Sequence, residues 1–317
     1  MEPIPLSYKH WQRARLHDTG TYAKPNVMKP AGTATPLPEK PKSFALDFRL
    51  DPERMEKCLA GVSGYDPWTM PQPLRDAIRA GLEETGLVSQ AGDSAKLLPE
   101  DGTSFTNIRG GYRVSDSIRI HPEKQTVIID EVPFRVGDLL VNRWENTEEM
   151  ALVLCTAGEE AGRRADRHRL NEDYLSWYCT SLISTLLVSV AMEELLRKLE
   201  TDATSGGFYI AGCGFPGNDG WTLTDQPRLF RLLPEDFCGV GITGGGMLSP
   251  VASLCGLVGL TRQRARRHPF RDACSNRDAR SHRDACRECR LQNCLFRHLH
   301  AEPLTALTGN FTALTGN

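Results

Sequence analysis

The stretch EDYLSWYCTSLISTLLVSVAMEE, residues 172–194, decides the fold of this chain. Its middle is apolar nearly all round, so the helix predicted over residues 171–200 should run through the protein core instead of lying on it. Asn171 is a good N-cap for this helix, and Arg197 and Lys198 favour its negative end. We therefore expect the other elements to pack around one long buried helix.

Length and composition limit the possible protein classes. The chain has 317 residues, enough for one large domain or two modest ones, and its formal charge of −2 gives no overall attraction to nucleic acid or membrane. Residues 1–42 contain no apolar segment of the kind found in signal peptides. The longest apolar stretch, residues 182–192, is about half the length of a bilayer span. These features predict a soluble, cytoplasmic protein without a membrane partner.

Composition changes along the chain mark its segments. Residues 1–45 are rich in proline, lysine, glycine and threonine and are expected to form a disordered tail. Residues 72–86 have the apolar spacing of a helix, whereas residues 104–143 alternate in the manner of β-strands. The apolar runs at residues 149–158 and 252–260 are each typical of a buried strand.

A turn-rich segment, FPGNDGW at residues 215–221, is the main candidate for a binding site. Gly217 and Gly220 can adopt positive φ, and the Asn-Asp pair between them tolerates turn geometry, so several backbone groups can face outward together. Trp221 adds a flat apolar surface with one hydrogen-bond donor. The loop can therefore bind a small polar ligand through its backbone; a structural turn beside a core tryptophan is the alternative.

A cysteine cluster near the end of the chain has the spacing of a metal site. Cys286 and Cys289 can bring two thiolates onto one metal, and Cys274 and Cys294 can complete four ligands. Four thiolates suit structural zinc or a redox-active iron–sulfur cluster, and the spacing leaves both open. Residues 266–300 are therefore predicted to form an Arg/Cys-rich metal-binding module.

Three stretches in one order resemble the activation (reactivation) domain of cobalamin-dependent methionine synthase, in its standalone form. They are FPGNDGWTLTDQPRLFRLLPEDFCGVGIT from residue 215, MLSPVASLCGLVGL from residue 247 and CRECRLQNCLFR from residue 286. The resemblance runs from about residue 55 to residue 297 and includes the core helix. The family motifs match without gaps at Pro216, Gly217, Gly220, Trp221, Gln226, Leu229, Phe230, Leu232, Leu233, Pro234, Cys238, Gly239, Pro250, Ser253, Gly256, Cys286, Cys289, Cys294 and Arg297.

The resemblance implies a fold and a ligand. The fold is α+β, with a twisted, mainly antiparallel β-sheet packed around a long central helix over residues 46–265, followed by the small C-terminal Cys-rich module. The ligand is S-adenosylmethionine, and no residue of the chain is implied to be catalytic. The positions implied to bind it are Pro216, Gly217, Asn218, Gly220, Trp221, Ser253 and Gly256.

The implied activity is the reductive reactivation of a corrinoid-dependent methyltransferase, an accessory methyltransferase activity. One electron and the sulfonium methyl group convert cob(II)alamin to methylcobalamin, with the cobalamin carried on a partner protein. The implied partners are a corrinoid methyltransferase or corrinoid protein and a flavodoxin-like or other electron donor. The protein would bring methyl donor and corrinoid into line, which is a positioning effect.

Three departures from the family pattern favour an alternative. The family has an arginine, which can pair with the ligand carboxylate, where this chain has Cys213, and a tyrosine where it has Asn218. Phe215 replaces a serine. Loss of a charged hydrogen bond to the carboxylate costs about 1.5–3 kcal/mol. A non-enzymatic corrinoid-protein adaptor is therefore the second reading of the sequence.

The C-terminal charge supports a third reading. Residues 261–300 hold eleven arginines against four acidic residues, so the module can grip a phosphate backbone as a metal-dependent nucleic-acid binder. Beyond residue 270 this block has one aromatic side chain, Phe296, and therefore no stacking platform. Docking of an acidic protein partner is preferred to nucleic acid. Residues 301–317 carry the hexapeptide TALTGN twice and are expected to form a disordered tail.

Overall fold

The computed structural model describes residues 41–48, 50–66, 68–87, 107–263 and 310–313. All of them belong to one unit, Ala34–Asn317. The basic block beyond residue 263 lies outside the described residues, as do the predicted metal ligands Cys274, Cys286, Cys289 and Cys294.

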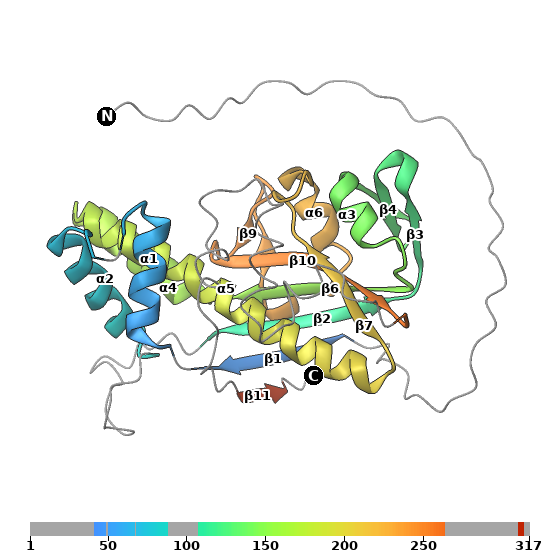
Figure 1. Cartoon of the computed structure of the whole chain (residues 1–317). Coiled ribbons are helices and arrows are strands. Elements are labelled where there is room, and N and C mark those ends of the chain that lie inside the picture. Colours follow the sequence, from blue (N-terminus) through green and yellow to red (C-terminus); the bar gives the residue numbers. More distant parts are fainter. Residues whose placement is uncertain (1–40, 49, 67, 88–106, 264–309, 314–317) are drawn as a thin grey trace. The chain divides into compact units, whose positions relative to one another are not determined.

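A six-stranded sheet in the order β11-β1-β2-β6-β10-β7 forms the centre of the fold, and all of its neighbouring strands are antiparallel (Figure 1). Val153 in the sheet is paired with Tyr112 on one side and with Gly256 on the other. The mainly antiparallel sheet and the two predicted buried strands are thereby confirmed. The strands are β1 (Lys42–Asp47), β2 (Arg109–Ser115), β6 (Glu149–Thr156), β7 (Tyr209–Gly214), β10 (Ser253–Thr261) and β11 (Asn310–Ala313).

The long helix α5 (Tyr174–Ser205) crosses one face of this sheet (Figure 1). Leu187 and Leu195 of α5 belong to the same buried cluster as Val153 and Cys155 of β6, as expected for a core helix. Among the described residues, α5 alone is long and apolar enough to cross a membrane, and 61% of its apolar window is buried inside the protein. Three more helices contribute to this layer: α1 (Pro52–Val62), α2 (Gln72–Glu84) and α4 (Glu159–Leu170).

The start of α5 differs from the prediction. Asn171 is the C-cap of α4 and not the N-cap of the long helix, because Glu172 takes a left-handed φ of 60° that separates the two helices. Asp173 is the N-cap of α5, and its Oδ1 accepts the backbone N–H of Ser176 at 3.1 Å. The helix then continues to Ser205 instead of ending at residue 200.

The opposite face of the sheet carries a second core cluster built from short elements. Residues 138–143 were expected to be β-structure but form a helix, because Leu140, Val141 and Trp144 place three fully buried side chains on one helical face. The elements of this layer are β3 (Ile118–His121), η1 (Pro122–Lys124), β4 (Thr126–Ile129), β5 (Val132–Arg135), α3 (Asp138–Arg143), η2 (Leu223–Asp225), α6 (Gln226–Phe230), η3 (Phe237–Gly239), β8 (Gly241–Ile242) and β9 (Leu248–Ser249).

Both segments predicted as tails contribute a strand to the sheet. Strand β1 begins at Lys42, inside the segment assigned to the N-terminal tail, and its Phe44 and Leu46 are buried. Strand β11 lies within residues 301–317 and is paired with β1, with Ala313 opposite Phe44. Strands this short do not alter the average composition of a segment, so composition alone does not reveal them.

Candidate ligand-binding loop

The candidate loop, residues 215–221, directly follows β7, which is an edge strand of the sheet. Its course depends on left-handed backbone conformations at Gly217, Asp219 and Gly220, with φ of 94°, 53° and 86°. Glycine adopts such angles without steric cost, and aspartate tolerates them better than most residues. The predicted turn geometry is therefore present.

Backbone hydrogen bonds close this loop on itself. The N–H of Gly217 donates to the carbonyl of Trp221 at 2.8 Å, and the N–H of Trp221 donates to the carbonyl of Asn218 at 2.8 Å. The N–H of Asn218 donates to the carbonyl of Phe215 at 3.0 Å. These bonds fix the loop in one shape before any ligand arrives.

Trp221 anchors the loop in the second core cluster. Its side chain is 2% exposed, and its Nε1 donates to Oδ2 of Asp225 at 3.0 Å. The indole meets the rings of Phe134 and Trp144 edge-on, at centroid distances of 6.0 and 6.5 Å. The indole is thus part of the core, and a ligand can contact the backbone of the loop but not the Trp221 ring.

The exposed part of the loop is its glycine turn. Gly217 and Gly220 are exposed, Asn218 is half-buried, and Pro216 is buried beneath them. Among the described residues, the N–H of Gly220 has no protein acceptor. The structure therefore presents backbone donor capacity at the surface, in a loop where the amides of Gly217, Asn218 and Trp221 are bonded internally.

The two predicted site residues from β10 are engaged within the protein. A Cβ added at Gly256 would overlap the ring of Phe215 and lie 2.7 Å from the carbonyl oxygen of Gly214, so Phe215 covers Gly256. The Ser253 hydroxyl is 2.6 Å from the carbonyl of Pro250 and 2.9 Å from the Thr156 hydroxyl. The structure brings Gly256 beside the loop, but its face is already occupied.

Arg143, at the end of α3, reaches the loop and was not identified from the sequence. Its Nη1 donates to the carbonyl of Cys213 at 2.6 Å and to Oδ2 of Asp219 at 3.2 Å. Its aliphatic carbons lie directly over Gly212 of β7. The Arg143 guanidinium, which comes from α3, therefore contacts the backbone at Cys213, the residue at which the sequence lacks the arginine of the family pattern.

The Cys213 side chain belongs to the core cluster on the α5 face, not to the loop. Other cysteines near the site are buried thiols: burial raises the pKa of Cys238 and of Cys255 to about 12. Such thiols stay protonated at neutral pH and are poor nucleophiles or metal ligands. Within the described ranges, no group of three or more His, Cys, Asp or Glu side chains is arranged to hold a metal ion.

In comparisons with known proteins, the chain matches solved structures only. No protein-family model and no curated protein matches the chain. Among solved structures, it is similar to the crystal structure of the MetH reactivation domain bound to AdoHcy, with a TM-score of 0.37 and 13% identity. The match covers 51% of this chain and 60% of that chain. This is the domain that the sequence motifs resemble.

Proposed function

We propose that the chain binds S-adenosylmethionine at the loop of residues 215–221 and takes part in the reductive reactivation of a corrinoid-dependent methyltransferase. The observation that carries this proposal is the exposed, internally bonded glycine turn held by the buried Trp221. A preformed turn loses little conformational freedom on binding, which favours a small polar ligand. The motif order around the turn supports the choice of ligand.

Two parts of the site would hold the ligand. The exposed backbone at Gly217 and Gly220 would contact its polar groups, and Arg143 would face its carboxylate. Arg143 is already paired with Asp219, so a ligand carboxylate would share or replace that contact. Because Phe215 covers Gly256, the ligand would lie on the outer side of the loop and not against β10.

The chemistry would come from the ligand and the partners. Bound S-adenosylmethionine supplies the methyl group, and a flavodoxin-like donor supplies the electron. The chain would contribute orientation: a rigid turn and one guanidinium fix the ligand, which lowers the entropic cost of bringing two reactants into line. A cytoplasmic location and a zinc or iron–sulfur centre at the C-terminal cysteines remain predictions.

Titration calorimetry of the full chain with S-adenosylmethionine tests this proposal, and Arg143→Met is the informative variant. Methionine keeps the aliphatic packing over Gly212 but removes the charge, so affinity should fall at least about tenfold. Asp219→Asn is the matched control: it breaks the same ion pair yet leaves Arg143 bonded to the Cys213 carbonyl, and binding should be retained or tightened.

One outcome would contradict the proposed binding of S-adenosylmethionine, and another would contradict only the role of Arg143 in it. No detectable binding up to about 1 mM, with or without a corrinoid protein present, would remove the methyl-donor role. Equal affinity of wild type and Arg143→Met would leave the loop as the site but remove Arg143 from it.

The second candidate is a corrinoid-protein adaptor without ligand binding. It is favoured by one observation, the packing of Phe215 onto Gly256, which covers one of the positions implied to bind the ligand. The chain would be such an adaptor if it captures a corrinoid protein in a pull-down while neither the wild type nor the variants Arg143→Met and Asp219→Asn give a calorimetric binding signal with S-adenosylmethionine. The nucleic-acid alternative rests on residues outside the described ranges.

A further inference from the structure

One end of the helical layer carries a group of exposed side chains, five aromatic and one leucine, that the proposed function does not use. We call it the aromatic patch, and its members are Tyr65, Trp68, Leu170, Tyr174, Trp177 and Tyr178. They come from the α1–α2 turn, the end of α4 and the first turns of α5, which lie together in Figure 1. The Tyr178 hydroxyl lies 3.5 Å from the Ser63 hydroxyl at the C-cap of α1, so the start of α5 lies next to the start of the α1–α2 turn.

The patch is large for the surface of a monomer. Trp68 is 83% exposed, Leu170 75% and Tyr174 63%. Taking about 200 Å² for each complete side chain, the six members expose on the order of 700 Å². Monomeric proteins rarely expose contiguous apolar patches of more than a few hundred Å². A standard protein interface buries about 800 Å² on each partner, so the patch is of the size that one partner contributes.

The backbone beneath the patch is fixed. In the α4–α5 turn, the N–H of Asp173 donates to the carbonyl of His168 at 3.0 Å, and the N–H of Glu172 donates to the carbonyl of Arg169 at 3.1 Å. Asp173 then caps α5 through Ser176. A partner would therefore meet a preformed surface, which reduces the entropic cost of association.

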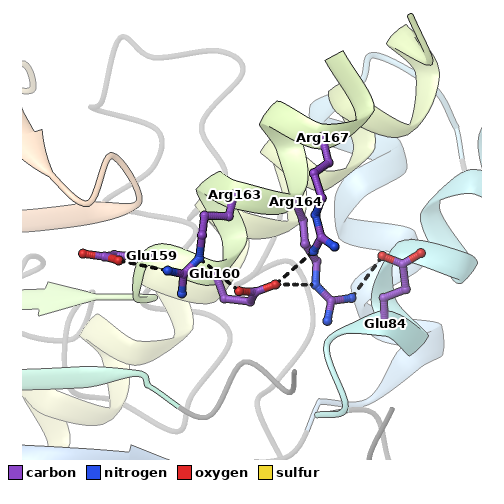
Figure 2. A network of polar contacts seen from close by, with 6 residues as sticks. All are labelled: Glu84, Glu159, Glu160, Arg163, Arg164 and Arg167. Atoms are coloured by element: carbon purple, nitrogen blue, oxygen red, sulfur yellow. Dashed lines mark hydrogen bonds and ion pairs between the residues drawn. The ribbon is translucent and has the colours of Figure 1, made fainter. Parts of the chain in front are cut away.

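The charged side chains of α4, the helix that ends at Leu170, are paired within the chain. Figure 2 shows Arg164 of α4 between Glu160 and Glu84, at 3.2 Å from each, with Arg167 also on Glu160 at 3.1 Å. The next turn repeats the arrangement, with Arg169 paired to Asp166. Along the described residues of α4, these pairs balance the arginines against acidic side chains. A strongly anionic partner, either a nucleic acid or an acidic membrane, would not be attracted by these paired charges.

An aromatic centre with a balanced charged border is the composition of a protein–protein interface, where tryptophan and tyrosine contribute most of the binding energy. A surface that carries both charge signs is also complementary to a copy of itself turned by a two-fold axis. We infer that the aromatic patch is the interface of a symmetric homodimer, with a second copy of this chain as the occupant.

Sedimentation equilibrium of the full chain tests this inference, with Trp68→Glu/Tyr174→Glu as the variant. Both side chains are mostly exposed, so the variant should keep the wild-type unfolding curve in the monomer. Because two-fold symmetry places four new carboxylates in one interface, the dimer dissociation constant should rise at least about 100-fold. The control is Val251→Glu, which changes an equally exposed apolar residue, 81% exposed, outside the patch and should leave the dimer intact.

Three results would overturn the inference. In the first, the wild type is monomeric at every concentration. In the second, the double variant dimerises as tightly as the wild type. In the third, Val251→Glu weakens the dimer as much as the double variant does. Flotation with vesicles of phosphatidylcholine and phosphatidylserine tests the alternative that the patch binds a membrane. If the wild-type monomer floats with them and the double variant does not, the patch belongs to a membrane.

Discussion

The two faces of the six-stranded sheet are built in different ways. The α5 face is a broad aliphatic layer that nevertheless buries ionisable groups, among them Glu193 at 8% and Glu194 at 3% exposure. The opposite face is smaller and depends on two indoles, Trp144 and Trp221, packed edge-on. The first face holds the long helix in place, and the second holds the candidate loop. Stability and ligand binding should therefore respond to different substitutions.

Glycines make the tryptophan face possible. A Cβ at Gly259 would lie 2.6 Å from Cδ1 of Trp144, and a Cβ at Gly214 would lie 2.8 Å from Cδ2 of Leu140. Real Cβ atoms do not approach this closely, so these positions accept only glycine while α3 stays in place. These two glycines make room for Leu140 of α3 and for Trp144 at its C-cap.

The largest expected effect is that of Trp221→Ala. Removing a fully buried indole should lower the free energy of unfolding by about 3–5 kcal/mol, because the cavity cannot close around Phe134 and Trp144. Trp221→Phe is the graded control: it keeps a ring and loses the bond to Asp225, so its cost should be smaller. Urea unfolding measures both. A loss below about 1 kcal/mol for Trp221→Ala would show that the indole is not the anchor.

The α5 face should be sensitive to pH through Glu193. Burial raises the pKa of Glu193 to about 7, against the opposing effect of Arg197 and Arg54 and with a smaller contribution from Glu194. Because the pKa is raised in the folded state, the folded protein keeps this proton longer than the unfolded chain. The resulting stabilisation is complete below the unfolded pKa and is lost as pH rises through about 7.

Glu193→Gln isolates this effect, because the amide does not titrate. Relative to the variant, the wild type should lose up to about 3 kcal/mol of unfolding free energy between pH 4.5 and pH 8. Urea unfolding of both proteins at the two pH values gives this double difference. A difference of the opposite sign, with the wild type gaining stability as pH rises, would contradict a buried and protonated Glu193.

Periodicity and turn residues predicted much of this fold, but not the connections between distant parts. The helix at residues 72–86 was predicted from Leu74, Ile78 and Leu82, and all three side chains are buried. Such patterns are local, so they can be read from a short window. The N-cap of α5 was misplaced by two residues, because a sequence does not show that Glu172 adopts a left-handed conformation.

At the candidate site too, local sequence patterns predicted the turn but not the contacts between residues that are distant in the sequence. The glycine turn was predicted, since Gly217 and Gly220 need no partner to adopt their conformations. Arg143 was not, because its contact with Cys213 spans 70 positions and no local pattern marks it. The covering of Gly256 by Phe215 was equally hidden, since it depends on how β7 and β10 pair. Whether Cys213 faces the loop or the core is likewise decided by strand pairing.

The smallest effect on stability gives the most direct test of the central claim, that the glycine turn is a ligand site. Gly220 and Gly64 have φ of 86° and 80°, and a Cβ at either would meet no atom within 4 Å. Alanine at each should therefore cost the same, about 1 kcal/mol of backbone strain. Only Gly220 lies in the loop; Gly64 follows α1.

The measurement is titration of wild type, Gly220→Ala and Gly64→Ala with S-adenosylmethionine. The account predicts that Gly220→Ala weakens binding at least about tenfold, because the added methyl group occupies the exposed face of the turn, while Gly64→Ala binds as the wild type does. Equal affinities for the two variants, at equal stability, would contradict a ligand site at this turn.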